Sequence, residues 1–325
     1  PNTPPSLQVW WSGDDFSPEP IQPASLYHVS DDPHLFEMSH LRTGRELFGS
    51  LNCRRCHPAK KEKTVSLPEW NLETPDLREV NRRLTPEWLS AWISDPHSIR
   101  PQATMTRLLD PVAPETLEQI QDLVAYLTSL SPSLPTPSGE ETEELRSEGE
   151  AHFENLGCIS CHTFTPPDQS DPWNRLSLHY TKAKFSPSGL KAFLLAPHEH
   201  YTSNRMPDFS LSKKEAVELT AWVRHNSHGE FPSFSTVRQA DPANGARLFQ
   251  EAGCATCHNH GLKESPPLQF PSLSTLTPSL NGCLAPDPPT TIPHYALTDS
   301  DRTALLRFLE AGRTSLDIDP PAEQA

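Results

Sequence analysis

The chain has 325 residues, enough for two or three domains that each bury a core, but only 35% of them are hydrophobic and 36 are proline. This composition predicts much irregular backbone and indicates that a bound cofactor supplies part of the apolar interior. The net charge of −15 disfavours nucleic acid and anionic membranes as partners and favours a basic or neutral docking face on a protein partner. No stretch approaches about 18 consecutive apolar residues, so no transmembrane segment is expected.

The first segment, residues 1–34, differs from the rest of the chain. Leu7, Val9 and Trp11 alternate as in a strand, and proline-rich extended chain follows. The segment resembles the tail of a protective-antigen-type β-sandwich, a sugar- or surface-binding module of large secreted bacterial proteins. The alternative is an extended arm that lies over the first domain of the remaining chain. Because Pro1 follows neither Met nor a basic leader, we expect a piece of a longer precursor or a larger chain.

Three copies of a Cys-x-x-Cys-His motif organise the remaining chain. They are Cys53, Cys56 and His57; Cys158, Cys161 and His162; and Cys254, Cys257 and His258. A glycine lies nine residues before each first cysteine and a phenylalanine five residues before it. This spacing puts both on one face of a helix, so short helices are predicted over 43–52, 148–157 and 244–253. The glycines Gly44, Gly149 and Gly245 leave room for a crossing helix.

Apolar residues at helical spacing predict that crossing helix near the end of each unit, over 115–127, 213–223 and 300–309. Its aligned aromatic residue is Tyr126, Trp222 or Phe308, and we expect it to pack on the glycine and phenylalanine of its own unit. A middle helix is predicted after Thr85-Pro86 and after Ser186-Pro187, ending at Pro96 and Pro197. The third unit lacks this middle helix.

Cys-x-x-Cys-His is the attachment sequence of c-type haem, in which the two thiols bond covalently to the porphyrin and the histidine binds the iron on the proximal side. A structural zinc site and a thioredoxin-like redox pair compete with this interpretation. Zinc would need further ligands at each copy, and no βαβ pattern surrounds the motifs. The sequence therefore predicts three c-type haems with iron.

Each unit resembles a class I cytochrome c domain, and the likeness covers about residues 40–312. It implies a mainly α fold of three tandem helical haem domains with proline-rich loops, over 35–131, 139–229 and a shortened 238–315. In this family a methionine ahead of the last helix binds the iron on the distal side. Met105 and Met206 occupy that place, so the resemblance implies that they bind the first and second irons. Met38 is expected to be ordinary packing.

The distal ligand of the third haem is open. Alignment puts Ile292 at the methionine position, and isoleucine cannot bind iron. Cys283, the one cysteine outside the motifs, and His294 in the same loop are both candidates, and a five-coordinate iron or His260 are further alternatives.

The resemblance implies electron transfer among three covalently bound haems and protein redox partners, because a haem with both axial positions filled has no room for substrate. An enzyme with peroxidase-like or sulfur-oxyanion chemistry at the third haem is one alternative. A surface- or carbohydrate-binding redox module of a larger secreted protein is another. Covalent haem attachment implies a periplasmic or extracellular location.

Overall fold

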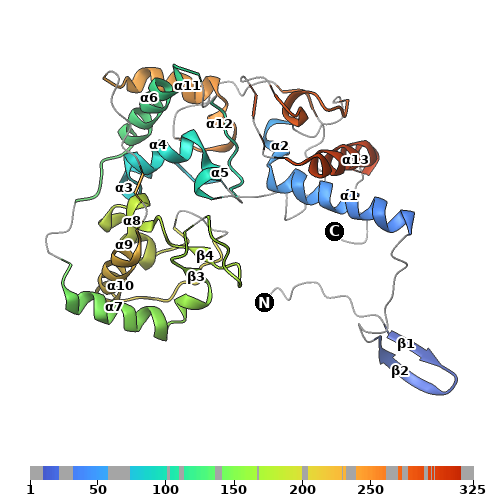
Figure 1. The fold of residues 1–325 in the computed structure, drawn as a ribbon, viewed down its shortest axis with the longest axis horizontal. Helices are drawn as coiled ribbons and strands as arrows, with labels where there is room; N and C mark the ends of the chain where they lie inside the picture. Colours follow the sequence, from blue (N-terminus) through green and yellow to red (C-terminus); the bar gives the residue numbers. More distant parts are fainter. Residues whose placement is uncertain are drawn as a thin grey trace, which may run out of the picture.

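A computed structural model describes most of the chain. The described ranges are 10–21, 32–57, 74–100, 103–109, 113–135, 141–166, 168–199, 204–228, 230–231, 239–260, 270–272, 277–288, 292–293, 295 and 297–315. Over these residues the fold is mainly helical with a short N-terminal β hairpin, which confirms the predicted class. Three pairs of crossing helices make up most of the helical body (Figure 1).

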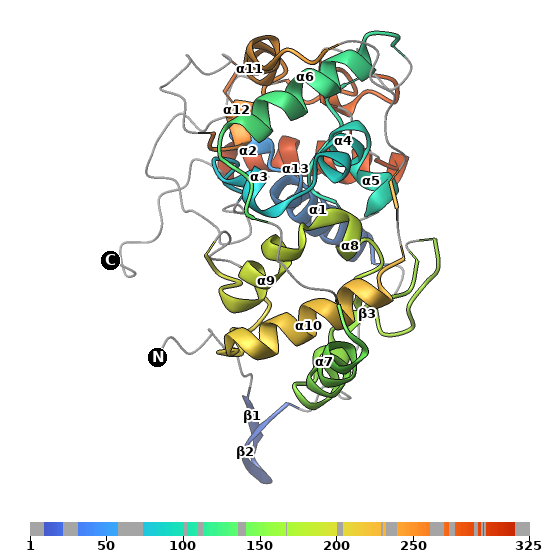
Figure 2. The same ribbon diagram turned by 90° about the vertical axis from the view of Figure 1, so that its left-hand side faces the viewer.

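Each pair joins one helix that leads into a cysteine motif to one long helix from elsewhere in the chain. α7 (Glu143–Asn155) crosses α10 (Lys213–Asn226), as Figure 2 also shows. α1 (Pro33–Ser50) crosses α13 (Asp299–Ser315). The third pair contains α11 (Pro242–Glu251) and α6 (Thr116–Ser129), which lie side by side in both views.

The predicted glycines lie at the three crossings. A Cβ atom on Gly44 would lie 2.7 Å from the Cβ of Phe308, one on Gly149 would lie 2.7 Å from that of Trp222, and one on Gly245 would lie 2.8 Å from that of Tyr126. Real Cβ atoms essentially never approach so closely, so only glycine permits this spacing between helices. The predicted function of these glycines is therefore confirmed.

The predicted helix partners are right in the second unit and wrong in the other two. α1 does not pack on α6 of its own unit, and α11 does not pack on α13; the two helices have exchanged partners. The aromatic contacts agree, because Phe48 lies 5.3 Å from Phe308 and Phe249 lies 5.6 Å from Tyr126 between ring centroids. The predicted boundaries at 131 and 238 thus separate helices that pack together. The repeated glycine and phenylalanine therefore predict that two helices cross, but not which of the three long helices is the partner.

Helix starts follow capping and proline signals. α4 (Pro86–Ser94) and α9 (Pro187–Leu195) begin after Thr85 and Ser186, whose hydroxyls accept backbone N–H groups, as predicted. α5 (Pro96–Ile99) follows α4 directly. α1 begins at Pro33, behind the N-cap Asp32, ten residues earlier than the predicted helix over 43–52.

The middle regions of the first and second units meet through equivalent residues. α3 (Val80–Arg83) and α8 (Thr181–Lys184) are followed by Leu84 and Phe185, which form an antiparallel bridge. The Thr85 N–H donates to the Lys184 carbonyl and the Ser186 N–H to the Arg83 carbonyl, both at 3.0 Å. This reciprocal pair gives the contact a local two-fold character and joins the two units.

Two separate apolar cores contain the buried side chains. The larger extends from α4, α6 and α11 across the bridge to α9 and α10, and the smaller lies between α1 and α13. The hairpin of β1 (Trp10–Gly13) and β2 (Phe16–Pro20) is exposed and projects from the helical body (Figure 1). Its strand contains Trp11, as predicted, whereas Leu7 and Val9 lie outside the described residues. Within the described part, no helix is both long and apolar enough to cross a membrane.

Replacing Gly149 by alanine tests the close crossing of α7 and α10. Alanine in an open helix position would stabilise the chain by roughly 0.5–1 kcal/mol. At this crossing we expect the opposite sign, a loss of about 1–3 kcal/mol in the free energy of unfolding, because the added methyl has no space. Denaturant unfolding measures the change, with the exposed neighbour variant Glu150→Ala as control. A more stable Gly149→Ala protein would contradict the crossing.

Candidate functional site

Two residues separate each cysteine motif from the end of the helix that leads into it. A residue in the left-handed region turns the chain at this point, with φ of 56° at Asn52, 74° at Gly157 and 79° at Gly253. One helical turn then brings the two cysteines of each copy together. The turns are α2 (Cys53–Cys56), a 3₁₀ helix (Cys158–Ser160) and α12 (Cys254–Cys257). No disulfide joins any of the cysteines.

The three motif histidines share one tautomer. His57 Nδ1 lies 2.9 Å from the Pro271 carbonyl oxygen and His258 Nδ1 lies 3.0 Å from that of Pro75. His162 Nδ1 lies 3.4 Å from the carbonyl oxygen of Leu176, at the short parallel pair of β3 (His162–Thr163) and β4 (Leu176–Ser177). A carbonyl can only accept, so Nδ1 carries the proton in each case. The Nε2 lone pair is left for a metal, as is usual for metal-binding histidines.

Burial favours the neutral form of two of the histidines, His162 and His258, and of several motif thiols. It lowers the pKa of His162 and of His258, while their hydrogen bonds to the carbonyl oxygens oppose that shift. Burial also raises the pKa of Cys53 and of Cys254 to about 12. Among the described residues, no group of three or more His, Cys, Asp or Glu side chains could hold a metal ion.

One cavity of about 1890 Å³ connects the three motifs. Every motif contributes at least one cysteine to its wall, and the second and third motifs also contribute their histidines, His162 and His258. Met105, Met206 and Ile292 line the same cavity. Ligand pockets usually measure 300–1,000 Å³, so this cavity has room for more than one large apolar group. Paired thiols, neutral histidines and a mostly apolar wall fit the predicted haems.

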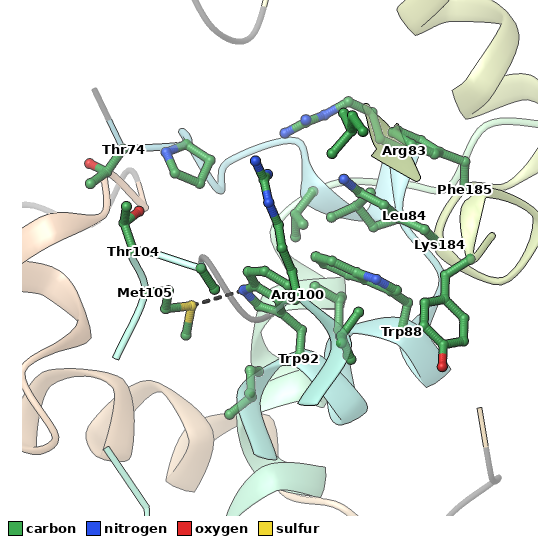
Figure 3. A pocket seen from close by; sticks show the side chains of 18 of the residues that line it. Thr74, Arg83, Leu84, Trp88, Trp92, Arg100, Thr104, Met105, Lys184 and Phe185 are labelled. Atoms are coloured by element: carbon green, nitrogen blue, oxygen red, sulfur yellow. Dashed lines mark hydrogen bonds between the residues drawn. The ribbon is translucent and has the colours of Figure 1, made fainter. Parts of the chain in front are cut away.

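The two predicted methionine ligands are held differently. Met105 Sδ accepts a hydrogen bond of 3.0 Å from Trp92 Nε1, drawn as the dashed line in Figure 3. Trp92 in turn stacks on Trp88, with ring centroids 5.0 Å apart. Met206 is placed by its backbone, because its N–H donates to Asn204 Oδ1 at 3.1 Å. The position in α9 that corresponds to Trp92 is Phe193, which cannot donate.

A group of three cations lies on the wall near Met105. Figure 3 shows the side chains of Arg83 of α3, Lys184 of α8 and Arg100, the residue that follows α5, near one another. Burial, followed by the charges of Arg100 and Arg83, lowers the pKa of Lys184 to about 8. Sequence analysis did not identify this group, because its members come from two units that are far apart in the chain and that come together around the bridge at Leu84 and Phe185.

The remaining candidate residues are placed as follows. Cys283 lies near the first motif, because its neighbour Leu284 packs on the same core as Cys53 and its charge contributes to the raised pKa of Cys53. Its expected role as a ligand of the third iron stays a prediction. His260 is buried and its Nδ1 lies 3.0 Å from the Tyr126 hydroxyl. His294 lies outside the described residues. Met38 is 60% exposed, so the expectation that it packs in a core is wrong.

Comparison with known proteins gives one family. Residues 41–131 match the family model of cytochrome c. This range starts inside α1 and ends just after α6, and it contains one cysteine motif and Met105. No curated protein and no solved structure matches the chain.

An acid titration tests the loop that carries the second motif. Arg175 donates to Asp171 at 2.7 Å and to the Ile159 carbonyl inside the motif at 3.1 Å. The hydrogen bonds from the Arg175 side chain and backbone to the carboxylate lower the pKa of Asp171 from 3.8 to about 2. A depressed carboxyl pKa gives stability that is complete above pH 3.8 and is lost as the pH falls through about 2.

We therefore expect Asp171→Asn to be less stable than the parent chain at neutral pH and to lose less stability on acidification. Unfolding curves at several pH values measure this difference. Glu154→Gln, at an exposed position of α7, is the control and should follow the parent. Parallel pH profiles for parent and Asp171→Asn would contradict the assigned interaction.

Proposed function

Because residues 41–131 are a cytochrome c domain, and such domains bind haem covalently, we propose that the chain is a three-haem c-type cytochrome that transfers electrons between protein partners. One observation carries the proposal. Three copies of the same arrangement, two thiols on one turn and a histidine with Nε2 free, are gathered around one cavity. A single copy would support only one haem.

The haem iron supplies reversible one-electron chemistry when it is bound. The chain's own residues do the rest. Each thiol pair would bind the porphyrin, and each histidine, held by its carbonyl partner, would offer Nε2 to the iron. Met105 and Met206 would offer thioether sulfurs as further iron ligands, and the mostly apolar wall would limit the access of water. These features support electron transfer without binding of a substrate.

The shared cavity supports exchange of electrons among the haems within the chain. Cys56 and Cys257 are near enough for their charges to interact, which brings the first and third motifs together. The bridge at Leu84 and Phe185 brings the second unit to the same cavity. The cations Arg83, which is buried, Lys184, which is partly buried, and the exposed Arg100 suit the carboxylate groups that every c-type haem carries, because opposite charges attract and a buried cation is stabilised by such a partner.

The location and partners belong to the same proposal. Cytochrome c domains are typically exported, and we place this chain in the periplasm or outside the cell. With a net charge of −15, electrostatic complementarity favours redox partners that have a basic or neutral docking face. The exposed Trp10, Trp11 and Phe16 of the hairpin leave open that the chain is a module of a larger secreted protein.

A haem enzyme is the second candidate function, and one observation favours it. Ile292, at the position of the missing methionine, lies on the cavity wall, so the haem that it faces has no methionine ligand. Such an iron has room for a small molecule, and the other two haems would supply its electrons.

Mass spectrometry of the denatured protein tests the number of haems. We expect the polypeptide mass plus three haems, because thioether bonds survive denaturation. The double variants Cys53→Ser/Cys56→Ser, Cys158→Ser/Cys161→Ser and Cys254→Ser/Cys257→Ser should each lose one haem. A parent protein that carries fewer than three covalent haems would reject the proposal in its present form.

Replacing Trp92 by phenylalanine tests the role of Met105. The Nε1 hydrogen bond withdraws electron density from the sulfur and so favours ferrous iron. Its loss should lower the reduction potential of one haem and leave the other two unchanged in a spectroscopic redox titration. Trp222→Phe, which changes a tryptophan on α10, serves as control. If all three potentials of Trp92→Phe equal those of the parent, Met105 is not an iron ligand.

A further inference from the structure

We infer that the first and third haem sites are built from exchanged halves of the chain. The haem attached to Cys254 and Cys257 takes His258 and Met105 as its axial ligands. The haem attached to Cys53 and Cys56 takes His57 and faces the segment of Cys283, Ile292 and Tyr295. This assignment rests on the proposed function, because it concerns where each haem is bound.

The proximal side of both sites supports the exchange. His258 donates to the carbonyl of Pro75, the Leu77 N–H donates to the Asn259 carbonyl at 2.8 Å, and the Thr74 hydroxyl donates to the Cys257 carbonyl. His57 donates to the carbonyl of Pro271 and lies 6.0 Å from the Phe270 ring. Each motif is therefore supported by the loop that follows the other one.

The apolar cores divide in the same way. Cys254 packs against the core that contains Trp88 and Leu123 of α4 and α6. Cys53 packs with Leu284 and Leu297, which precede α13. The distal methionine, Met105, is bonded to Trp92 of α4 and so belongs to the core of the third motif.

A buried carboxylate explains why α6 selects α11. Asp122 of α6 is fully buried, and it accepts the Asp241 N–H and the Asn244 side-chain amide, both at 2.7 Å. Asp241 is the N-cap of α11, so its N–H has no partner inside the helix, and the positive end of the helix dipole adds to the attraction.

The same carboxylate would not be satisfied by α1. The α1 position that corresponds to Asp241 is His40, which lies inside Pro33–Ser50, where backbone N–H groups bond within the helix. Asp122 would then be buried against a helix without free donors, and a buried charge without hydrogen-bond partners is strongly destabilising. At the position of Asp122, α13 has Ala304, whose side chain needs no hydrogen-bond donor from α1.

A second polar contact selects the same partners independently. The Tyr126 hydroxyl of α6 lies 3.0 Å from Nδ1 of His260, two residues past His258, and both side chains are buried. The corresponding residue after His57 is Ala59, which has no polar side chain. α13 has Phe308 in place of Tyr126 and packs on Phe48 without needing a hydrogen-bond partner.

Spectroscopy of variants that lack one haem tests the assignment. Met105→Ala is combined with Cys254→Ser/Cys257→Ser or with Cys53→Ser/Cys56→Ser, and the charge-transfer band of the Fe–S(Met) bond is recorded. We expect Met105→Ala to weaken the band when the first haem is missing and to change nothing when the third haem is missing. The reverse pattern, an effect in both backgrounds, or an effect in neither would overturn the assignment.

A second measurement keeps all three haems. A photoreactive benzophenone side chain at position 308 should cross-link to peptides of α1, whereas cross-links to α11 would overturn the exchange. The mass of the parent protein separates the two levels of the argument. Missing haem contradicts the proposed function, while three haems with cross-links from position 308 to α11 contradict only the exchange.

Discussion

The close approach of two helices at a glycine is the constraint on which each haem site depends. Gly44, Gly149 and Gly245 let the backbone of a second helix reach the helix that leads into the motif, where any larger residue would collide. At the crossings of α1 with α13 and of α11 with α6, the phenylalanine one turn later packs on the aromatic side chain of the second helix. Because the first cysteine directly follows the left-handed residue that ends this segment, the helix crossing also determines where the two thiols and the histidine lie.

The sequence predicted this unit well, because the residues concerned lie within one turn of each other. The motifs, the glycines, the capped middle helices after Thr85 and Ser186 and the mainly helical class all follow from local spacing. The helices on which α1 and α11 pack could not be predicted from local spacing. The glycine and the phenylalanine are the same in all three crossings and therefore do not determine which helices pair. The pairing is determined by side chains that differ between the copies.

Asp122 and Tyr126 show what such a choice requires. Both are polar, both are buried, and both find partners in α11 and the residues after it. In the sequence they look like ordinary helix residues beside apolar neighbours, and only the comparison of all three copies distinguishes them from Ala304 and Phe308. The cations near Met105 escaped prediction for a related reason, since Arg83 and Lys184 come together only when two units form their reciprocal bridge.

The central claim is that three irons surround one cavity. Anomalous X-ray diffraction at the iron absorption edge, from crystals of the mature protein, tests it most directly. The account predicts three iron peaks along this cavity, one next to each of His57, His162 and His258. Fewer than three peaks, or a peak on the outer surface away from the cavity, would contradict it.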